Sequence, residues 1–281
     1  YAAGPGGRLG LHRHRSDEIE VIEACPLGMP GVGDSEVLAR RWTAVTGVEV
    51  IRGDHGEVAV LEHRPGPGRQ ARGRRPPDRV DVVAGPAQVT RTIGGRTMSV
   101  AAGGFWQVHP HAADAFAAAL LDALQPRAGD IVLDLYSGAG ALTAVLADAV
   151  GQTGRVVAVE SDRTAVADGE RNLGQLPWVE VRRARVGGAT VDSAGVTPDL
   201  VVLDPPRAGA GREVMAALLA SGARGIGYVA CDPASLARDV RTALDAGWRL
   251  AGLRGFDAFP MTHHVECVAH LTPPDPHPDS L

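Results

Sequence analysis

Two residues in the last quarter of the chain have side chains that could perform covalent chemistry. Cys231 follows a predicted buried strand in the segment Tyr228–Pro233, and Glu266 lies on the last predicted strand. A thiolate that adds to carbon 6 of a uracil ring makes carbon 5 nucleophilic enough to accept a methyl group. A base must then remove the proton from carbon 5 so that the thiol can leave. Together with a glycine-rich cofactor turn and a polar strand end upstream, the pair predicts covalent methyl transfer to a pyrimidine, with Cys231 as nucleophile and Glu266 as base.

Both residues also have a plainer interpretation. A lone buried cysteine is more often inert core, and a glutamate on a strand is more often an ordinary carboxylate on one face. The position of Cys231 favours the nucleophile, because a helix is predicted to begin directly after it, and a helix N-terminus lowers a thiol pKa. Cys267 must point to the opposite face of the strand from Glu266 and is assigned to the core. His263 and His264 are left unassigned.

A glycine-rich turn upstream predicts a cofactor site. It runs from Asp134 to Gly140, contains Gly138, and joins a predicted strand to a predicted helix. Its glycines let the backbone approach a ligand, and Glu160, at the end of the next strand, can hold both ribose hydroxyls. Thr143 replaces the third glycine of the dinucleotide-binding motif. The turn therefore favours S-adenosylmethionine, which has no phosphate to cradle; another nucleotide and a purely structural turn are the alternatives.

The segment Asp204-Pro205-Pro206-Arg207 closes a further predicted strand, at the kind of strand end where open α/β sheets bind ligands. Asp204 and Arg207 are therefore candidates for contacts to the substrate. Amino-methyltransferases of nucleic acids usually carry an aromatic residue after such a motif, which stacks on the base. Arg207 stands in that place, so chemistry on an exocyclic amine is disfavoured.

The 281 residues alternate between strands and helices from residue 111 onward. Alternation of this kind predicts an α/β fold, in which a mainly parallel sheet carries helices on both faces. Residues 1–100 are predicted to form a β-rich, RNA-contacting subdomain, 101–272 the catalytic domain, and 273–281 a disordered tail. The predicted strands are 131–133, 156–159, 179–181, 200–203, 226–230, 248–254 and 264–271, and the predicted helices are 111–124, 142–150, 163–173, 211–221 and 233–246.

An arginine-rich segment, residues 64–79, is the candidate for contacts to an RNA backbone. It holds Arg64, Arg69, Arg72, Arg74, Arg75 and Arg79. Guanidinium groups suit phosphate, although a solvated loop is an equally simple interpretation. Residues 1–100 hold 14 Arg and 12 acidic residues, a net charge of +2. Residues 101–281 hold 14 Arg and 21 acidic residues, a net charge of −7. A polyanion is therefore expected to meet the N-terminal part.

The composition predicts a cytoplasmic protein. The chain has three cysteines, Cys25, Cys231 and Cys267, and a set that is sparse and odd in number is typical of a reducing compartment. No apolar run approaches the ~20 residues of a membrane span. We expect no membrane partner, no bound metal and a monomer.

These motifs, taken in order, resemble the uracil-C5 RNA methyltransferases of the TrmA/RumA type over residues 100–272. The matching stretches are Phe105–Val108, Asp134–Gly140, Val159–Glu160, Asp204–Arg207, Val229–Pro233, and Phe259–Pro260 with His264–Glu266. The resemblance implies a class I, Rossmann-like fold with a seven-stranded sheet, and tRNA or rRNA as substrate. It assigns the nucleophile to Cys231 and the base to Glu266. It implies contacts to S-adenosylmethionine from Gln107, Tyr136, Glu160 and Asp204.

The chain departs from the family pattern in its N-terminal part and after the third predicted strand of the catalytic domain. Residues 8–100 resemble the family's RNA-contacting insert only loosely, and Cys25 stands where many members keep the last of four iron–sulfur cysteines. The other three, and the small N-terminal β-barrel of many members, are absent. We therefore expect an N-terminally truncated chain, with a cluster only if upstream cysteines exist. The segment Arg182–Arg185 replaces the Asp or Asn that members often offer to adenine.

The predicted function is therefore transfer of a methyl group from S-adenosylmethionine to carbon 5 of a uridine in RNA. Two alternatives remain open at this point. One is a methyltransferase for another acceptor, such as an RNA amine or a small molecule. The other is a non-catalytic RNA-binding relative.

Overall fold

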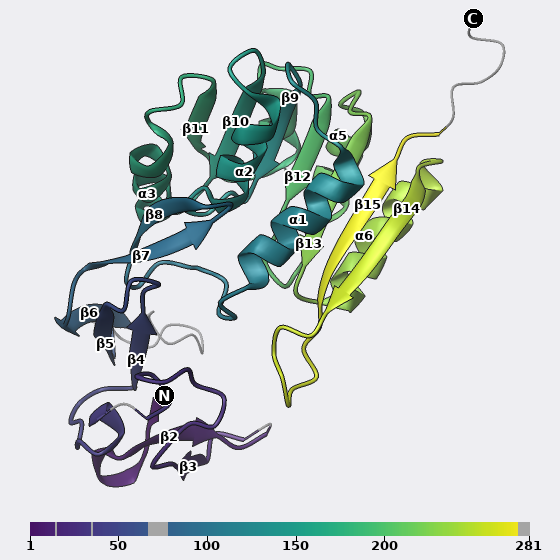
Figure 1. The fold of residues 1–281 in the computed structure, drawn as a ribbon. Helices are drawn as coiled ribbons and strands as arrows, with labels where there is room; N and C mark the ends of the chain where they lie inside the picture. The colour runs from purple at the N-terminus through teal and green to yellow at the C-terminus, as the bar shows by residue number, and fades with distance from the viewer. Residues whose placement is uncertain (15, 35, 67–77, 275–281) are drawn as a thin grey trace, which may run out of the picture. The chain divides into compact units, whose positions relative to one another are not determined.

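The computed structural model describes the chain except for residues 15, 35, 67–77 and 275–281 (Figure 1). Most of the arginine-rich segment 64–79 and of the predicted tail 273–281 therefore lies outside the described residues. The chain divides into two compact units. Unit 1 contains Tyr1–Arg91 and Ser99–Gly104, and unit 2 contains Thr92–Met98 and Phe105–Leu281. None of the helices in the described part of the chain is both long and apolar enough to cross a bilayer.

Unit 1 is built on an antiparallel sheet with the strand order β3-β2-β1-β4-β5-β6. Its strands are β1 (Ala2–Ala3), β2 (Leu9–His12), β3 (Ile19–Val21), β4 (Gly47–Arg52), β5 (Val58–Arg64) and β6 (Arg79–Ala84), with short 3-10 helices at Pro5–Gly7 and Glu36–Leu38. Strands β4 and β5 form a hairpin, and Gly56 adopts a φ of +90° in its turn, a conformation that glycine reaches readily. Two further strands, β7 (Gln88–Ile93) and β8 (Arg96–Ala101), form a separate sheet.

Unit 2 contains a seven-stranded sheet with the order β11-β10-β9-β12-β13-β15-β14. Its strands are β9 (Ile131–Leu135), β10 (Arg155–Glu160), β11 (Val179–Arg183), β12 (Leu200–Leu203), β13 (Gly225–Ala230), β14 (Arg249–Phe256) and β15 (Glu266–Thr272). Neighbouring strands run parallel except where β15 pairs with β13 and with β14. The prediction of a mainly parallel sheet is confirmed, as is the β-rich N-terminal part.

Helices cover both faces of this sheet (Figure 1). They are α1 (Ala112–Leu124), α2 (Ala141–Val150), α3 (Arg163–Leu173), α4 (Gly188–Asp192), α5 (Arg212–Leu219) and α6 (Pro233–Asp245). Alternate strand residues pack into two separate apolar clusters: Leu200 and Val202 join the cluster of α1 and α2, whereas Val201 and Leu203 join that of α5 and α6. The central strands are apolar on both faces because both faces are covered.

Parallel pairing brings the carboxyl ends of β9, β10, β12 and β13 to one edge of the sheet. Asp134, Glu160, Asp204 and Cys231 lie at or directly after those ends. Because β15 runs antiparallel to β13, its first residue, Glu266, lies at the same edge. Strand topology thus gathers residues that are more than a hundred positions apart in the sequence.

Candidate active site

Cys231 and Glu266 are brought together by strand register. In the pairing of β13 with β15, Ala230 lies opposite Cys267, so the next position of the same register places Cys231 opposite Glu266. Cys231 is half-buried and forms no disulfide, and Glu266 is 4% exposed. Cys267 faces the apolar cluster of α5 and α6, as expected from the alternation of side chains along a strand. The predicted base therefore begins β15, and the predicted nucleophile directly follows the neighbouring strand β13, at one edge of the sheet.

The electrostatic surroundings of Cys231 differ from the expectation drawn from the sequence. Burial raises the pKa of the thiol, and the nearby carboxylates of Glu266 and Asp204 raise it further. The helix after it begins at Pro233, but Asp232 caps that helix by accepting a hydrogen bond from the Ser235 amide at 2.7 Å. The expected lowering by the helix N-terminus is thus outweighed. The positive charge of Arg207 acts in the opposite direction to the carboxylates and lowers the pKa of the thiol.

The surroundings of Glu266 shift the pKa of its carboxyl group upward. Burial raises the pKa of its carboxyl group, and the Arg207 guanidinium lowers it. A general base works best when its pKa lies near the working pH, so a raised carboxylate pKa favours this role. Arg207 itself is exposed, and its charge acts on both Cys231 and Glu266.

Asp204 lies beside this pair and contacts a third predicted residue. Its carboxylate accepts a hydrogen bond from the Gln107 side-chain amide at 3.4 Å. Burial, together with the negative charges of Glu266 and Asp134, raises the pKa of Asp204 to about 7. Gln107 precedes α1 and Asp204 follows β12, so this contact joins segments 97 residues apart in the chain.

The glycine-rich turn has the strained backbone that its sequence indicates. Gly138 and Gly140 have φ values of +55° and +89°, and Tyr136 has +60°, which is uncommon for a residue other than glycine. The side chain of Asp134 is buried and accepts a hydrogen bond from the Thr143 hydroxyl at 2.5 Å. Burial raises the pKa of Asp134 to about 7. Thr143, which replaces a motif glycine, therefore holds the carboxylate that opens the turn.

Glu160 connects the glycine-rich turn to the next strand. Its carboxylate accepts a hydrogen bond from the Gly138 amide at 3.0 Å and from the Asp162 amide at 2.7 Å. Within the described residues, the buried hydroxyl of Ser137 has no hydrogen-bond partner. A buried polar atom without a partner is unfavourable and is relieved when a ligand supplies one. Ser137 was not among the predicted site residues, because nothing in the sequence distinguishes it from an ordinary turn serine.

The close fit of Gly140 gives a testable prediction. A Cβ atom added at Gly140 would lie 2.6 Å from the Leu173 side chain, whereas one added at Gly138 would meet nothing within 4 Å. We expect Gly140→Ala to lower the free energy of unfolding by ~1–3 kcal/mol more than Gly138→Ala does, because α2 must shift away from α3. Thermal unfolding of the two variants measures this difference, and equal losses would contradict it.

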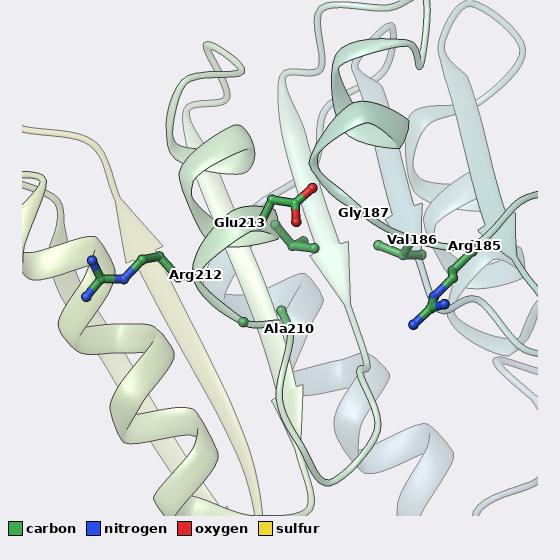
Figure 2. A pocket seen from close by; sticks show the side chains of 8 residues that line it. Arg185, Val186, Gly187, Ala210, Arg212 and Glu213 are labelled. Atoms are coloured by element: carbon green, nitrogen blue, oxygen red, sulfur yellow. The ribbon is translucent and has the colours of Figure 1, made fainter.

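The segment Arg182–Arg185 offers no acid to a nucleotide base, as the sequence indicates. Arg182 is turned back toward β11, where it bonds Glu180 at 2.6 Å. Arg185 lines a hollow of about 470 Å³ between β11 and the start of α5, together with Gly187, Ala210 and Glu213 (Figure 2). Glu213 accepts a hydrogen bond from the Gly188 amide at 3.2 Å.

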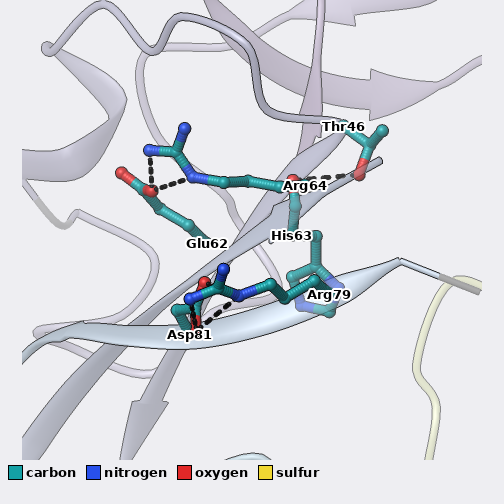
Figure 3. A network of polar contacts seen from close by, with 6 residues as sticks. All are labelled: Thr46, Glu62, His63, Arg64, Arg79 and Asp81. Carbon is teal, nitrogen blue, oxygen red and sulfur yellow. Dashed lines mark hydrogen bonds and ion pairs between the residues drawn. The ribbon is translucent and has the colours of Figure 1, made fainter. Parts of the chain in front are cut away.

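Two of the arginines predicted to contact RNA are already paired in unit 1. Arg64 bonds Glu62 on β5 at 2.8 Å, and Arg79 bonds Asp81 on β6 at 3.0 Å (Figure 3). The other four, Arg69, Arg72, Arg74 and Arg75, lie outside the described residues. Phosphate would have to compete with these carboxylates for Arg64 and Arg79, so contacts from these two to RNA remain a prediction.

Cys25 is the residue that the family resemblance places at the position of an iron–sulfur ligand. It is half-buried and free, and it is the one cysteine in the sequence of unit 1. Such a cluster is held by several cysteine thiolates. Among the described residues, no three His, Cys, Asp or Glu side chains gather as a metal site would require.

Two family models match different parts of the chain. The model of tRNA (uracil-5-)-methyltransferase matches residues 183–273, which hold Asp204, Arg207, Cys231 and Glu266. The model of protein-L-isoaspartate(D-aspartate) O-methyltransferase matches residues 106–189, which hold the glycine-rich turn. The predicted reacting residues therefore lie in the part that matches the uracil-5 model, and the glycine-rich turn lies in the part that matches the O-methyltransferase model.

Similar proteins extend the match over nearly the whole chain. It is 44% identical to an uncharacterized RNA methyltransferase of Streptomyces avermitilis, over 97% of this chain and 66% of the relative. It is 43% identical to an uncharacterized RNA methyltransferase of Streptomyces coelicolor, over 97% of this chain and 62% of that relative. It is 37% identical to one of Corynebacterium diphtheriae, over 95% of this chain and 65% of that relative. The chain thus spans a little under two thirds of these relatives' length.

A solved structure has the same fold. It is the tRNA (uracil-54, C5)-methyltransferase of Pyrococcus abyssi in complex with S-adenosyl-L-homocysteine, with a TM-score of 0.69 and 20% identity, over 92% of this chain and 72% of that one. At this identity the likeness establishes the α/β methyltransferase fold. Residues 183–273, which hold the reacting residues, are thus similar to the tRNA (uracil-5-)-methyltransferases, and the chain as a whole is similar to RNA methyltransferases.

Proposed function

We propose that this protein is an S-adenosylmethionine-dependent RNA methyltransferase that acts on carbon 5 of a uridine. The observation that carries the proposal is the register of β13 and β15, which sets Cys231 opposite Glu266 beside Asp204. Covalent methylation of a weakly nucleophilic carbon needs a thiol and a base within reach of one ring. A methyltransferase for an amine would need no thiol, because nitrogen is already nucleophilic.

In this proposal each reacting residue has one role. The thiolate of Cys231 forms a bond to carbon 6, and the electron pair of the 5,6 double bond moves toward carbon 5 and the carbonyl at carbon 4. Carbon 5 then takes the methyl group, which S-adenosylmethionine supplies when bound. Glu266 removes the proton from carbon 5, the double bond re-forms, and the Cys231 thiolate leaves. The charge of Arg207 keeps both acidic groups closer to their ionised forms.

The cofactor is proposed to lie along the sheet edge from the glycine-rich turn to Asp204. S-adenosylmethionine carries a positive sulfonium and a positive ammonium, and this edge holds an excess of carboxylates that raise one another's pKa. The buried Ser137 hydroxyl lacks a partner, and Gly138 faces open space. These features fit a cationic amino-acid ligand. The residues proposed to hold it are Gln107, Tyr136, Gly138, Gly140, Glu160 and Asp204.

The raised carboxylate pKa values predict how cofactor binding depends on pH. Asp134 and Asp204 have pKa values of about 7, so at acid pH both are protonated and neutral. A cation binds the ionised forms better, and its binding must therefore release protons. We expect affinity to rise by up to roughly tenfold per pH unit for each carboxylate between pH ~5 and ~7, and then to level off.

Isothermal titration calorimetry in two buffers of different ionisation enthalpy measures both the affinity and the released protons. Asp204→Asn keeps the shape of the side chain and removes one of the two titrating groups. It is expected to flatten the pH dependence. An affinity that is independent of pH, or that increases toward acid, would contradict the proposed role of these carboxylates.

RNA, either tRNA or rRNA, is proposed as the substrate because the family model and the solved relative are both described as acting on uracil in tRNA. The test is to incubate the protein with S-adenosylmethionine and unmodified transcripts of both kinds, then to analyse the nucleosides by mass spectrometry. The proposal predicts 5-methyluridine. A methyl group on a different nucleoside, or cofactor binding without any RNA methylation, would contradict it.

A further inference from the structure

A buried hydrogen-bond network lies on both sides of Cys231 in the sequence. Tyr228, on β13, precedes the cysteine by three residues, and Asp239, on α6, follows it by eight. Tyr228 is fully buried and Asp239 is 5% exposed. The Tyr228 hydroxyl donates to a carboxylate oxygen of Asp239 at 2.7 Å. Neither residue has a role in the chemistry proposed above.

The partners of this network are backbone amides of the loop that follows β12. This loop, residues 205–211, begins directly after Asp204 and carries Arg207. The Ala210 amide donates to the Asp239 carboxylate at 2.8 Å and to the Tyr228 hydroxyl oxygen at 3.0 Å, and the Gly211 amide donates to Asp239 at 3.3 Å. Three donors thus converge on one carboxylate, which has no proton to donate when ionised.

The loop packs closely against the carboxylate of Asp239. Gly209 has a φ of +81°, and a Cβ atom there would lie 2.6 Å from an Asp239 oxygen. The Gly209 amide donates to the Pro206 carbonyl at 2.8 Å and closes a turn around Arg207. Arg238, the residue before Asp239, donates to the Ala208 carbonyl at 3.3 Å. The backbone on the carboxyl side of Arg207 is therefore held in one conformation by α6.

We propose that Tyr228 and Asp239 are positioning residues, which hold the loop of residues 205–211 and thereby place the guanidinium of Arg207 beside Cys231 and Glu266. The two residues lie on the strand that precedes Cys231 and on the helix that follows it, so the network ties the loop of Arg207 to both of these elements. The consequence for catalysis rests on the proposed function. The hold on the loop rests on its hydrogen bonds to Asp239 and Tyr228, and the closeness of Arg207 to the pair rests on the effect of its charge on both groups.

The placement has an electrostatic consequence that an experiment can follow. The charged and titratable groups that act on the Cys231 thiol are Glu266 and Asp204, which raise its pKa with burial, and Arg207, which lowers it. A loop released from Asp239 would let the exposed guanidinium of Arg207 move away from Cys231, and the effect of a solvated charge falls off with distance. The thiol pKa would then rise, and Cys231 would react more slowly at neutral pH.

The test is the pH dependence of alkylation of Cys231 by iodoacetamide, followed by mass spectrometry of the peptide that contains it. We expect Arg207→Gln, Tyr228→Phe and Asp239→Asn each to move the midpoint to higher pH and to slow the reaction at pH 7 about three- to tenfold. At high pH the rates should converge with that of the wild-type protein. Tyr228→Phe keeps the buried ring, so it carries the test if Asp239→Asn does not fold.

The matched control is Asp130→Asn. Asp130 is also largely buried and accepts hydrogen bonds from the Arg127 amide and the Arg224 side chain, but it lies before β9, at the opposite edge of the sheet. The Asp130→Asn variant is expected to lose stability without any shift in the pH midpoint of Cys231 alkylation. A shift as large in Asp130→Asn as in Asp239→Asn would assign the effect to general loosening and overturn the proposal.

A double-mutant cycle tests whether Asp239 acts through Arg207. If it does, adding Asp239→Asn or Tyr228→Phe to Arg207→Gln should move the midpoint no further, because the counter-charge is already gone. Additive shifts, or no shift in either single variant, would overturn the proposal. Alkylation needs neither RNA nor cofactor, so this result stands apart from the test of the proposed function. If the protein methylates uridine, the turnover rate of the Tyr228 and Asp239 variants should fall at neutral pH and recover at alkaline pH, with the KM for S-adenosylmethionine little changed.

Discussion

Cys231→Ala is expected to abolish methyl transfer and to leave the binding of S-adenosylmethionine intact. Carbon 5 of uracil reacts with a methyl donor only after a thiolate has added to carbon 6. Without the thiol, therefore, no methyl transfer is expected, rather than a slower one. A loss of the order of 10⁴-fold or more is expected, as for other enzymes that lose a nucleophile. Cys231→Ser is expected to behave in the same way, because its hydroxyl is scarcely ionised at neutral pH.

The matched control is Cys25→Ser. Cys25 is, like Cys231, half-buried and not in a disulfide, but it belongs to unit 1. It should retain turnover. Methyl transfer is measured by the appearance of 5-methyluridine and cofactor binding by calorimetry. Turnover by Cys231→Ala within a factor of ten of the wild-type rate would rule out the covalent mechanism.

Glu266→Gln is expected to stop the reaction at a later step, after the methyl group has been transferred. The amide has nearly the shape of the carboxylate but cannot take the proton from carbon 5, so the Cys231–RNA bond cannot break. Removing the carboxylate also removes a charge that raises the thiol pKa, so the first step should not be slowed. A methylated protein–RNA adduct should therefore accumulate, visible as a slow band on a denaturing gel.

The control for this variant is Glu180→Gln. Glu180 is also a strand carboxylate of unit 2, but it lies on β11 and pairs with Arg155 and Arg182. It should turn over without an adduct. Multiple turnover by Glu266→Gln at the wild-type rate would show that another group removes the proton. A loss of turnover without an adduct would mean that Glu266 is needed before methyl transfer.

The sequence predicts those elements whose boundaries have a local chemical cause. The helix predicted over 163–173 matches α3 at both ends. Its start has a local cause, because Asp162 accepts hydrogen bonds from the Thr164 and Ala165 amides and fixes the first turn. The strand over 200–203 matches β12, which is apolar throughout. The helix predicted over 211–221 is shorter, since α5 ends at Leu219. The short α4 was not predicted, because its N-cap, Gly187, makes no side-chain hydrogen bond.

The site was predictable as a set of residues but not as an arrangement. The order of motifs identifies Cys231 and Glu266, yet only strand register places them on neighbouring strands. The thiol pKa was predicted with the wrong sign, because three-dimensional burial and two carboxylates decide it rather than the adjacent helix. Tyr228 and Asp239 read in the sequence as an ordinary strand tyrosine and a helix-surface acid, and their contact across 11 residues appears only on folding.

The most direct measurement of the central claim uses RNA that contains 5-fluorouridine. Fluorine cannot leave carbon 5 as a cation, so Glu266 has no proton to remove and the covalent species should persist. Incubation with S-adenosylmethionine should yield a protein–RNA band on a denaturing gel, whose cross-linked peptide contains Cys231, and Cys231→Ala should yield none. An adduct at a residue other than Cys231, or its absence from wild-type protein that methylates ordinary RNA, would contradict the account.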